Sequence, residues 1–291
     1  MNKSFFSGEF FHNYRRNSSA IIGSIIIFIF LVMVTVGPLL TPQNPYNIRE
    51  LNLADAFKPP AWIDGGDSRY ILGTDGQGRD ILSSVVYGSR ISLFIGVGAV
   101  CAAAFIGTTL GLLAGYFGGR LDALIMRIAD IQLSFPSILI ALFLMSVFGR
   151  GVDKILISLT LVGWVHYART VRGSTLSEKQ KEYVQAARVM GYPNRRIIIR
   201  HILPNVLTAL IVIATIQVGT FILIEASLSF LGVGVPVTRP SLGLVVKNGF
   251  DVLFSGMWWA SVFPGAFIML LVFGIYLFGD FLRDELNPQL K

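Results

Sequence analysis

Long uncharged runs separate shorter polar segments along the chain. Residues 20–40 carry no charged side chain, and as a helix this run would extend about 31 Å, enough for one bilayer crossing. Further apolar runs lie between Arg90 and Arg120, over 128–148, from about 152 to 168, over 206–231 and over 252–279. The pattern predicts an all-α polytopic membrane protein with six transmembrane helices.

The composition supports this class of protein. Of the 291 residues, 53% are hydrophobic and 14% are charged, whereas an average soluble domain carries about 25% charged residues. Intrinsic disorder, a basic nucleic-acid-binding domain and a secreted disulfide scaffold are therefore excluded. The single cysteine, Cys101, lies in an apolar run, and we expect it to pack between helices.

The distribution of basic residues predicts the orientation. The first apolar run is longer than the hydrophobic region of a signal peptide, about 7–15 residues, and we expect it to remain as a span. The net charge is +7, and eight Lys and Arg residues lie between Arg169 and Pro204. Because cytoplasmic loops are rich in such residues, both termini are predicted to be cytoplasmic. The expected organisation is a cytoplasmic segment at 1–19 and a transmembrane domain at 20–291, with an outer loop at 41–90 and a cytoplasmic loop at 169–204.

The cytoplasmic loop is too long for a simple turn, which suggests a function. Residues 176–190 have the pattern of a short helix, and Gly191 follows where a left-handed C-cap favours glycine. Pro193 suits the first turn of a second helix. Ala186 and Ala187 are small, so we expect a partner backbone to approach closely at this turn.

Several catalytic motifs are absent from the sequence. It has no Gly-Lys pair, and hence no phosphate-binding loop for ATP, and no zinc-protease or nucleophile-elbow motif. Its three histidines, His12, His166 and His201, are far apart. The glycines between Gly73 and Gly78 follow no βαβ pattern, so a nucleotide site is set aside. We expect a chain that is not an enzyme by itself and binds no cofactor or metal.

The segment from Tyr183 to Asn205 resembles a known signature. Its order, Gln185-Ala186-Ala187, then Gly191, then Leu203-Pro204, resembles the EAA loop of permease subunits from ABC importers. In that family the loop is a coupling helix that docks into a cleft of the ATPase subunit. Gln185 stands where the family pattern has glutamate, and His201 where it has isoleucine. Glu182, one turn earlier, is the alternative acidic contact.

The resemblance extends over nearly the whole chain. Five segments are similar to the DppC/OppC-like permeases of peptide importers: Leu72 to Asp75 with Gly78 to Asp80, Tyr87-Gly88, Leu228 to Gly232, Gly279 to Asp284, and Asn287-Pro288. The resemblance implies a type I ABC importer permease fold in a bacterial inner membrane. It also implies a B-type permease, two cytoplasmic ATPase subunits that bind ATP and Mg, and an extracytoplasmic binding protein as partners, with no nucleic acid. The cargo is expected to be a peptide or a similar small solute.

Some charged residues allow more than one interpretation. Asp75, Arg79 and Asp80 in the outer loop are expected either to contact the binding protein or to form a local network that shapes the loop. Glu225 is an intramembrane carboxylate near the outer mouth, where helix packing, loop anchoring and contact with cargo at an outer gate are all open. Asp130 is expected to pair with Arg127 one turn earlier.

Other features have simpler expected roles. Arg169 and Arg172, at the membrane edge, are expected to bind lipid phosphate. Glycines spaced along the second span permit close helix contact and indicate packing rather than a pore: Gly96, Gly98, Gly107, Gly111 and Gly115. A stand-alone secondary transporter or channel is the main alternative, and a membrane enzyme is a more distant one.

Overall fold

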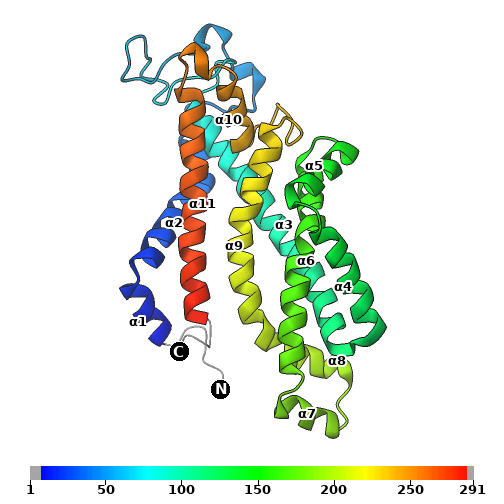
Figure 1. Ribbon diagram of the computed structural model, residues 1–291. Helices are drawn as coiled ribbons and strands as arrows, with labels where there is room; N and C mark the ends of the chain where they lie inside the picture. The colour runs from blue at the N-terminus through cyan, green and yellow to red at the C-terminus, as the bar shows by residue number, and fades with distance from the viewer. Residues whose placement is uncertain (1–7, 287–291) are drawn as a thin grey trace.

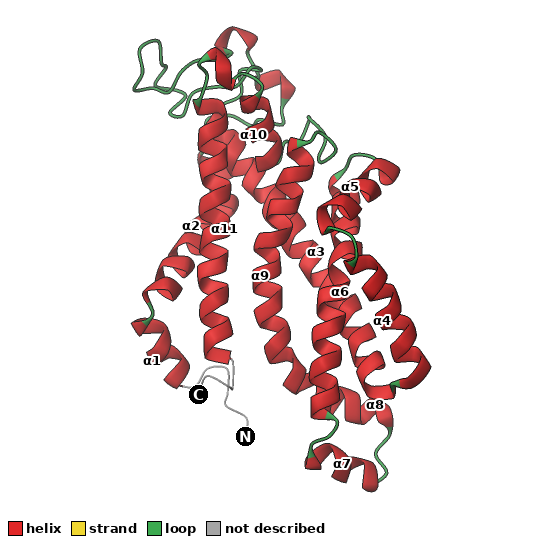
Figure 2. Cartoon of the chain, in the orientation of Figure 1, coloured by secondary structure: helices red, strands yellow, loops and turns green. Residues whose placement is uncertain are grey.

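The computed structural model describes residues 8–286, and within them helices dominate (Figures 1 and 2). In this range the only β contact is an isolated bridge between Thr74 and Asp80. The main helices are α1 (Gly8–Arg16), α2 (Ser18–Leu40), α3 (Ile81–Phe117), α4 (Gly119–Leu133), α5 (Ser137–Phe148), α6 (Val152–Glu178), α7 (Glu182–Val189), α8 (Asn194–Ile197), α9 (Leu203–Phe230), α10 (Leu242–Phe250) and α11 (Trp259–Leu286). The predicted segment 1–19 falls partly outside the described residues, and the Asn287-Pro288 motif falls wholly outside them.

The long helices connect two different ends of the molecule (Figure 1). The segment 41–80, helix α10 and the turns around it gather at one end, which we call the loop end. Helices α1, α7 and α8 lie at the other, which we call the α7 end. Helix α1 is held against α11 there, because the Phe10 and Phe281 ring centroids are 5.5 Å apart and Asn13 Nδ2 donates to Glu285 at 2.9 Å.

The length and composition of the helices confirm a polytopic membrane protein. In the described part of the chain, four helices are long and apolar enough to cross a membrane: α2, α3, the stretch Asn194–Phe230 and α11. Helices α4 and α5 would add a fifth span if the pair crosses as one, although they are bent by 92°. Helix α6 has 27 residues but is more polar. The predicted count of six spans is therefore not confirmed.

The third predicted span, 128–148, is interrupted and does not form one continuous helix. It breaks between α4 and α5, where Pro136 has no N–H to donate and disfavours helical geometry in the preceding residue. The Gln132 side chain fixes the bend against α6. Its Nε2 donates to the carbonyl oxygens of Leu161 and Val162 at 3.0 and 2.8 Å, and its Oε1 accepts from Trp164 Nε1 at 3.0 Å.

Helix α3 has 37 residues and packs along α6 through small residues. A Cβ on Gly107 would lie 2.4 Å from the carbonyl oxygen of Trp164, and one on Gly111 would lie 2.6 Å from that of Ala168. The predicted glycine-rich seam is therefore confirmed as a packing surface. Cys101, by contrast, is exposed on α3, so the expectation that it packs between helices is wrong.

Two element boundaries differ from those expected from sequence. Helix α3 begins at Ile81 rather than near Arg90, because the Asp80 carboxylate caps it and accepts from the Ser83 backbone N–H at 2.7 Å. The loop before it is correspondingly shorter. The last span begins at Trp259 rather than near Val252, and the unexpected helix α10 precedes it.

Candidate functional site

Helix α7 lies beyond the end of α6 (Figure 1), and most of its residues are exposed. The predicted helix 176–190 is wrong in its bounds, because α6 continues to Glu178 and α7 starts only at Glu182. The turn between them is closed by Gln185, whose Nε2 donates to the Lys179 carbonyl oxygen at 2.9 Å. The Lys179 ammonium in turn donates to the Gly115 carbonyl oxygen at the end of α3, at 3.0 Å.

Helix α7 has one buried and one exposed face. Val184 and Ala187 are buried in an apolar cluster with Tyr116 of α3. Glu182, Gln185 and Ala186 are exposed. The expectation that both alanines face a partner is therefore wrong for Ala187, since α7 turns that position toward its own chain and only Ala186 is available.

The end of α7 carries two exposed apolar side chains that the sequence reasoning did not select. Val189 is 88% exposed and Met190 is 63% exposed. Helices α7 and α8 and the turn between them form a hairpin that lies beyond α6, and adjacent exposed apolar side chains at its tip can take part in a contact surface. Their position beside Gly191, at the end of an otherwise polar helix face, is the signal in the sequence that could have identified them.

Gly191 ends α7 as predicted. Its φ is +74°, and the N–H of Tyr192 donates back to the Ala187 carbonyl oxygen at 3.1 Å. A Cβ at Gly191 would meet nothing within 4 Å, so glycine is favoured there for its backbone conformation alone. Pro193 is the N-cap of α8 rather than a residue of its first turn.

The remaining signature residues, Leu203 and Pro204, start α9 after a π-helical turn at Ile198–Ile202. They are brought back toward α7 through Asn205, whose Nδ2 donates to the Tyr183 hydroxyl at 3.0 Å. The structure therefore gathers the residues of the predicted coupling loop at the α7 end.

Tyr116 attaches this hairpin to α3, and no local sequence pattern indicated it. Its hydroxyl donates to Asn194 Oδ1 at 2.7 Å, and the guanidinium carbon of Arg188 lies 5.1 Å from its ring centroid. The Lys179 ammonium group adds to this attachment by donating to the carbonyl oxygens of Gly115 and Tyr116 on α3. These partners are more than 60 residues apart in sequence, and only the packing of α3 against α6 brings them together.

Two ion pairs lie between α4 and α6, and one of them corrects an earlier expectation. Arg169 pairs with Asp130, so the predicted Asp130–Arg127 pair is wrong. Arg172 Nη2 donates to Asp122 Oδ2 at 2.6 Å. Because α4 packs beside α6, each guanidinium group lies within reach of a carboxylate of α4. The expected contact of Arg169 and Arg172 with lipid phosphate stays a prediction.

At the loop end, the motif containing Asp75, Arg79 and Asp80 is buried. Asp75 Oδ1 accepts the backbone N–H groups of Gln77 and Arg79 at 2.8 and 3.0 Å. Burial raises the pKa of the Asp75 and Asp80 carboxyl groups, and the hydrogen bonds that these groups accept act in the opposite direction. Gly78 has a φ of +71° in this turn, and a Cβ there would lie 2.1 Å from the Asn52 carbonyl oxygen. The motif thus shapes the loop from within.

Glu225 is distant in sequence from this motif and binds three elements together. Its side chain is fully buried, and its carboxylate accepts from Ser92 of α3 and Ser229 of α9, each at 2.7 Å. Ser241, directly before α10, donates to the Ser229 hydroxyl at 3.2 Å. We interpret this network as an anchor between helices.

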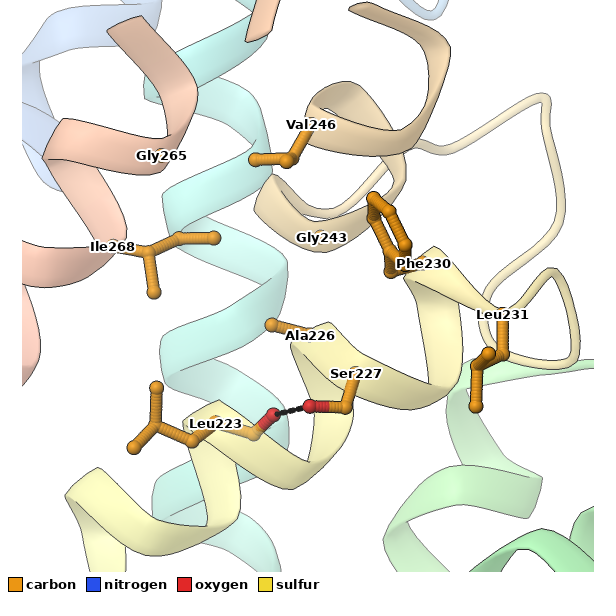
Figure 3. A pocket seen from close by; sticks show the side chains of 9 residues that line it. All are labelled: Leu223, Ala226, Ser227, Phe230, Leu231, Gly243, Val246, Gly265 and Ile268. Carbon is orange, nitrogen blue, oxygen red and sulfur yellow. Dashed lines mark hydrogen bonds between the residues drawn. The ribbon is translucent and has the colours of Figure 1, made fainter. Parts of the chain in front are cut away.

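An apolar pocket of about 410 Å³ lies between α9, α10 and α11 (Figure 3). Its lining includes Phe230 and Leu231 of the α9 end, Val246 of α10 and Ile268 of α11. The Ser227 hydroxyl at its wall already donates to the Leu223 carbonyl oxygen at 2.8 Å. The pocket therefore suits an apolar group better than a charged one.

Comparison with models of protein families shows to which family the chain belongs. Residues 107–291 match the model of the binding-protein-dependent transport system inner membrane component, which is more than half of the sequence. The chain belongs to this family of transport permeases. Residues 4–60 of the permease also match the N-terminal TM domain of oligopeptide transport permease C.

Curated relatives cover nearly the whole permease. It is 41% identical over 283 residues to the dipeptide transport system permease protein DppC of Alkalihalophilus pseudofirmus, with 97% of this chain and 90% of the relative covered. It is 39% identical over 278 residues to the oligopeptide transport system permease protein OppC of Bacillus subtilis, covering 96% and 88%. It is 40% identical over 284 residues to DppC of Escherichia coli K12, covering 97% and 93%.

A solved structure confirms the fold class. The permease is similar to a chain of the MetNI methionine ABC transporter in an inward-facing conformation, with a TM-score of 0.57 and 22% identity. The match covers 70% of this permease and 96% of that chain. The permease therefore has the fold of a type I ABC importer permease and is a multi-pass membrane subunit.

Proposed function

We propose that this permease forms half of the translocation path of an ATP-driven peptide importer and that α7 couples it to a cytoplasmic ATPase subunit. The observation that carries the proposal is the projecting hairpin with exposed Val189 and Met190, joined to α3 through Tyr116. The relatives named for dipeptide and oligopeptide transport support peptides as cargo.

The expected assembly contains a second, B-type permease, two ATPase subunits and an extracytoplasmic binding protein. ATP and Mg belong to the ATPase subunits in this scheme. Glu182 and Gln185 border the exposed face of α7 and supply its polar contacts, while Val189 and Met190 enter an apolar part of the ATPase cleft. Movement of the ATPase subunits then shifts α7 and, through Tyr116, helix α3.

We propose an orientation in which the α7 end lies in the cytoplasm of a bacterial cell and the loop end lies outside the inner membrane. The basic segment 169–204 and the basic last turn of α1 support this assignment. Under it, Asp75, Arg79 and Asp80 act in the external loop, where their burial favours shaping the loop over direct contact with a binding protein.

The first prediction tests coupling. The Val189→Glu substitution places a charge in the proposed apolar contact, so we expect at least a tenfold loss of ATPase subunits on co-purification and a matching loss of cargo-stimulated hydrolysis. Gly191→Val should act similarly, because valine resists a φ of +74°. Insertion and pairing with the second permease should persist, as measured by membrane fractionation and pull-down.

Leu53→Glu is the matched control, because Leu53 is 74% exposed at the loop end. It should leave ATPase binding unchanged. Normal uptake and cargo-stimulated hydrolysis in both the Val189 and Gly191 variants would exclude α7 as the coupling element.

The second prediction tests orientation. In a Cys101→Ala background, a cysteine replacing the exposed Lys181 should react with an impermeant maleimide only after the cytoplasmic side is opened. A cysteine replacing Asp64, exposed at the loop end, should react in intact spheroplasts. The reverse labelling pattern would contradict both the orientation and the assignment of α7 to the ATPase side.

A further inference from the structure

The helical stretch that contains α9 begins with exposed arginines. This stretch, Asn194–Phe230, is long and apolar enough to cross a membrane, and it includes α8, the π-helical turn and α9. Arg195, Arg196 and Arg200 lie in its first two turns and are exposed. Arg200 precedes the apolar run at 206–231 by about 9 Å along the helix, and the headgroup layer of a bilayer is about 5–7 Å thick. These arginines therefore lie near the phosphates of one membrane surface when the stretch spans the bilayer.

A fourth arginine joins them from α4. The Tyr116 hydroxyl donates to Asn194 Oδ1 at 2.7 Å, so the end of α3 is bonded to the residue directly before Arg195. Arg120 follows Tyr116 closely in the chain, at the start of α4, and is exposed. Helix α8 also lies closer to the long helices than α7 does (Figure 1). We call Arg120, Arg195, Arg196 and Arg200 the arginine patch.

The arginine patch lacks acidic partners within residues 8–286. None of its side chains forms an ion pair in that range. The Arg196 guanidinium carbon lies 4.3 Å from the Tyr192 ring centroid, which is a contact with an uncharged group. Apart from Glu182, the acidic residues of α4, α6 and α7 already pair with other basic residues: Asp122, Asp130, Asp153 and Glu178. The surrounding helices therefore do not balance the positive charge of the patch.

Large apolar side chains are exposed among these arginines. On the same stretch as Arg200, Ile199 is 48% exposed, and on α4 Leu121 and Leu124 are 40% and 60% exposed. Arginine next to exposed apolar groups suits the boundary of a bilayer, because guanidinium groups bind phosphate while the apolar side chains contact acyl chains. This combination favours a membrane surface over the surface of a soluble subunit.

We propose that the arginine patch binds the phosphate groups of anionic phospholipids at the membrane surface. A guanidinium group holds a phosphate through two parallel hydrogen bonds, and arginines clustered next to a span attract lipids with a net negative charge. Bound lipid then holds the start of α9 at the membrane surface, while α7 beyond it remains available for another contact. The proposal requires only that α9 spans the membrane, so it depends neither on the coupling role of α7 nor on the orientation.

The test uses the complete purified complex in phosphatidylcholine vesicles that contain increasing fractions of a photoactivatable phosphatidylglycerol. Mass spectrometry of the crosslinked peptides measures the labelling of residues 194–207. We expect half-maximal labelling at an about tenfold lower lipid fraction than with the matching photoactivatable phosphatidylcholine, because only phosphatidylglycerol carries a net negative charge.

Substitutions within the patch measure the contribution of single arginines. Arg195→Gln and Arg200→Gln should each raise the half-maximal fraction of phosphatidylglycerol about fivefold, the effect of one basic residue near an anionic surface. Arg195→Lys keeps the charge and should retain most of the labelling. Arg49→Gln is the matched control, because Arg49 is exposed at the loop end, and it should leave the labelling of residues 194–207 unchanged.

Equal half-maximal fractions for the two photoactivatable lipids in the wild-type complex would overturn the proposal, and this comparison does not require any variant to fold. Glutamine variants that assemble and are labelled like the wild type would also overturn it. Unchanged lipid labelling combined with a loss of ATPase subunits on co-purification would assign the arginine patch to the ATPase instead. Val189→Glu should leave lipid labelling unchanged, so a failure of the coupling proposal is measured separately.

Discussion

The Gly107→Ala substitution is expected to lower the free energy of unfolding by about 3 kcal/mol, the upper part of the range for overpacking a tight contact. The added Cβ would lie 2.4 Å from the Trp164 carbonyl oxygen and 2.5 Å from the Tyr167 Cβ. Neither atom can move without displacing the backbone of α6, so the whole α3–α6 seam has to open. The measurement is thermal unfolding of the purified complex, together with the amount of permease in the membrane.

Gly173→Ala on α6 is the matched control, since a Cβ there would meet nothing within 4 Å. Alanine is a better helix former than glycine by about 1 kcal/mol, so this variant should be unchanged or slightly more stable. Equal midpoints of thermal unfolding for the Gly107→Ala and Gly173→Ala variants would contradict a tightly packed contact between α3 and α6.

The second large effect is expected at Glu225. The Glu225→Leu substitution removes the acceptor for Ser92 and Ser229 and disturbs the Ser241 contact, leaving buried hydroxyls without partners. Each buried hydroxyl without a partner costs about 1–3 kcal/mol, so we expect the free energy of unfolding to fall by roughly 3–5 kcal/mol when the network is removed. Glu225→Gln keeps the shape and one acceptor oxygen and should lose less.

Thermal stability, complex assembly and uptake measured on the same preparations distinguish an anchor from a cargo contact. For an anchor, all three should decline together, and more in the leucine variant than in the glutamine variant. Wild-type stability and assembly combined with lost uptake would show instead that Glu225 contacts the cargo.

Sequence patterns predicted the local features of this permease well. The left-handed position of Gly191 follows from a helix that must end, and the glycines of α3 follow from the small residues that close helix contact requires. The all-α class follows from the length of the apolar runs. Each of these features depends on a short stretch of chain or on composition, and such information is fully present in the sequence.

The errors concern interactions between distant segments. Asp130 has Arg127 one turn away, yet it pairs with Arg169 because α6 packs beside α4. Ala186 and Ala187 are the same small residue and cannot be told apart in the sequence. The way α7 packs on its own chain buries Ala187 and leaves Ala186 exposed. Tyr116 could not be identified, since its role depends on partners from α7 and α8.

The uninterrupted length of α3 has a mechanical consequence. Its 37 residues extend about 55 Å, from the Asp80 cap at the loop end to Tyr116 beside α7. A stiff rod of that length acts as a lever, and a tilt of about 5° at one end displaces the other by roughly 5 Å. Under the proposed coupling role of α7, a small rotation of α7 would therefore also move the loop end of α3.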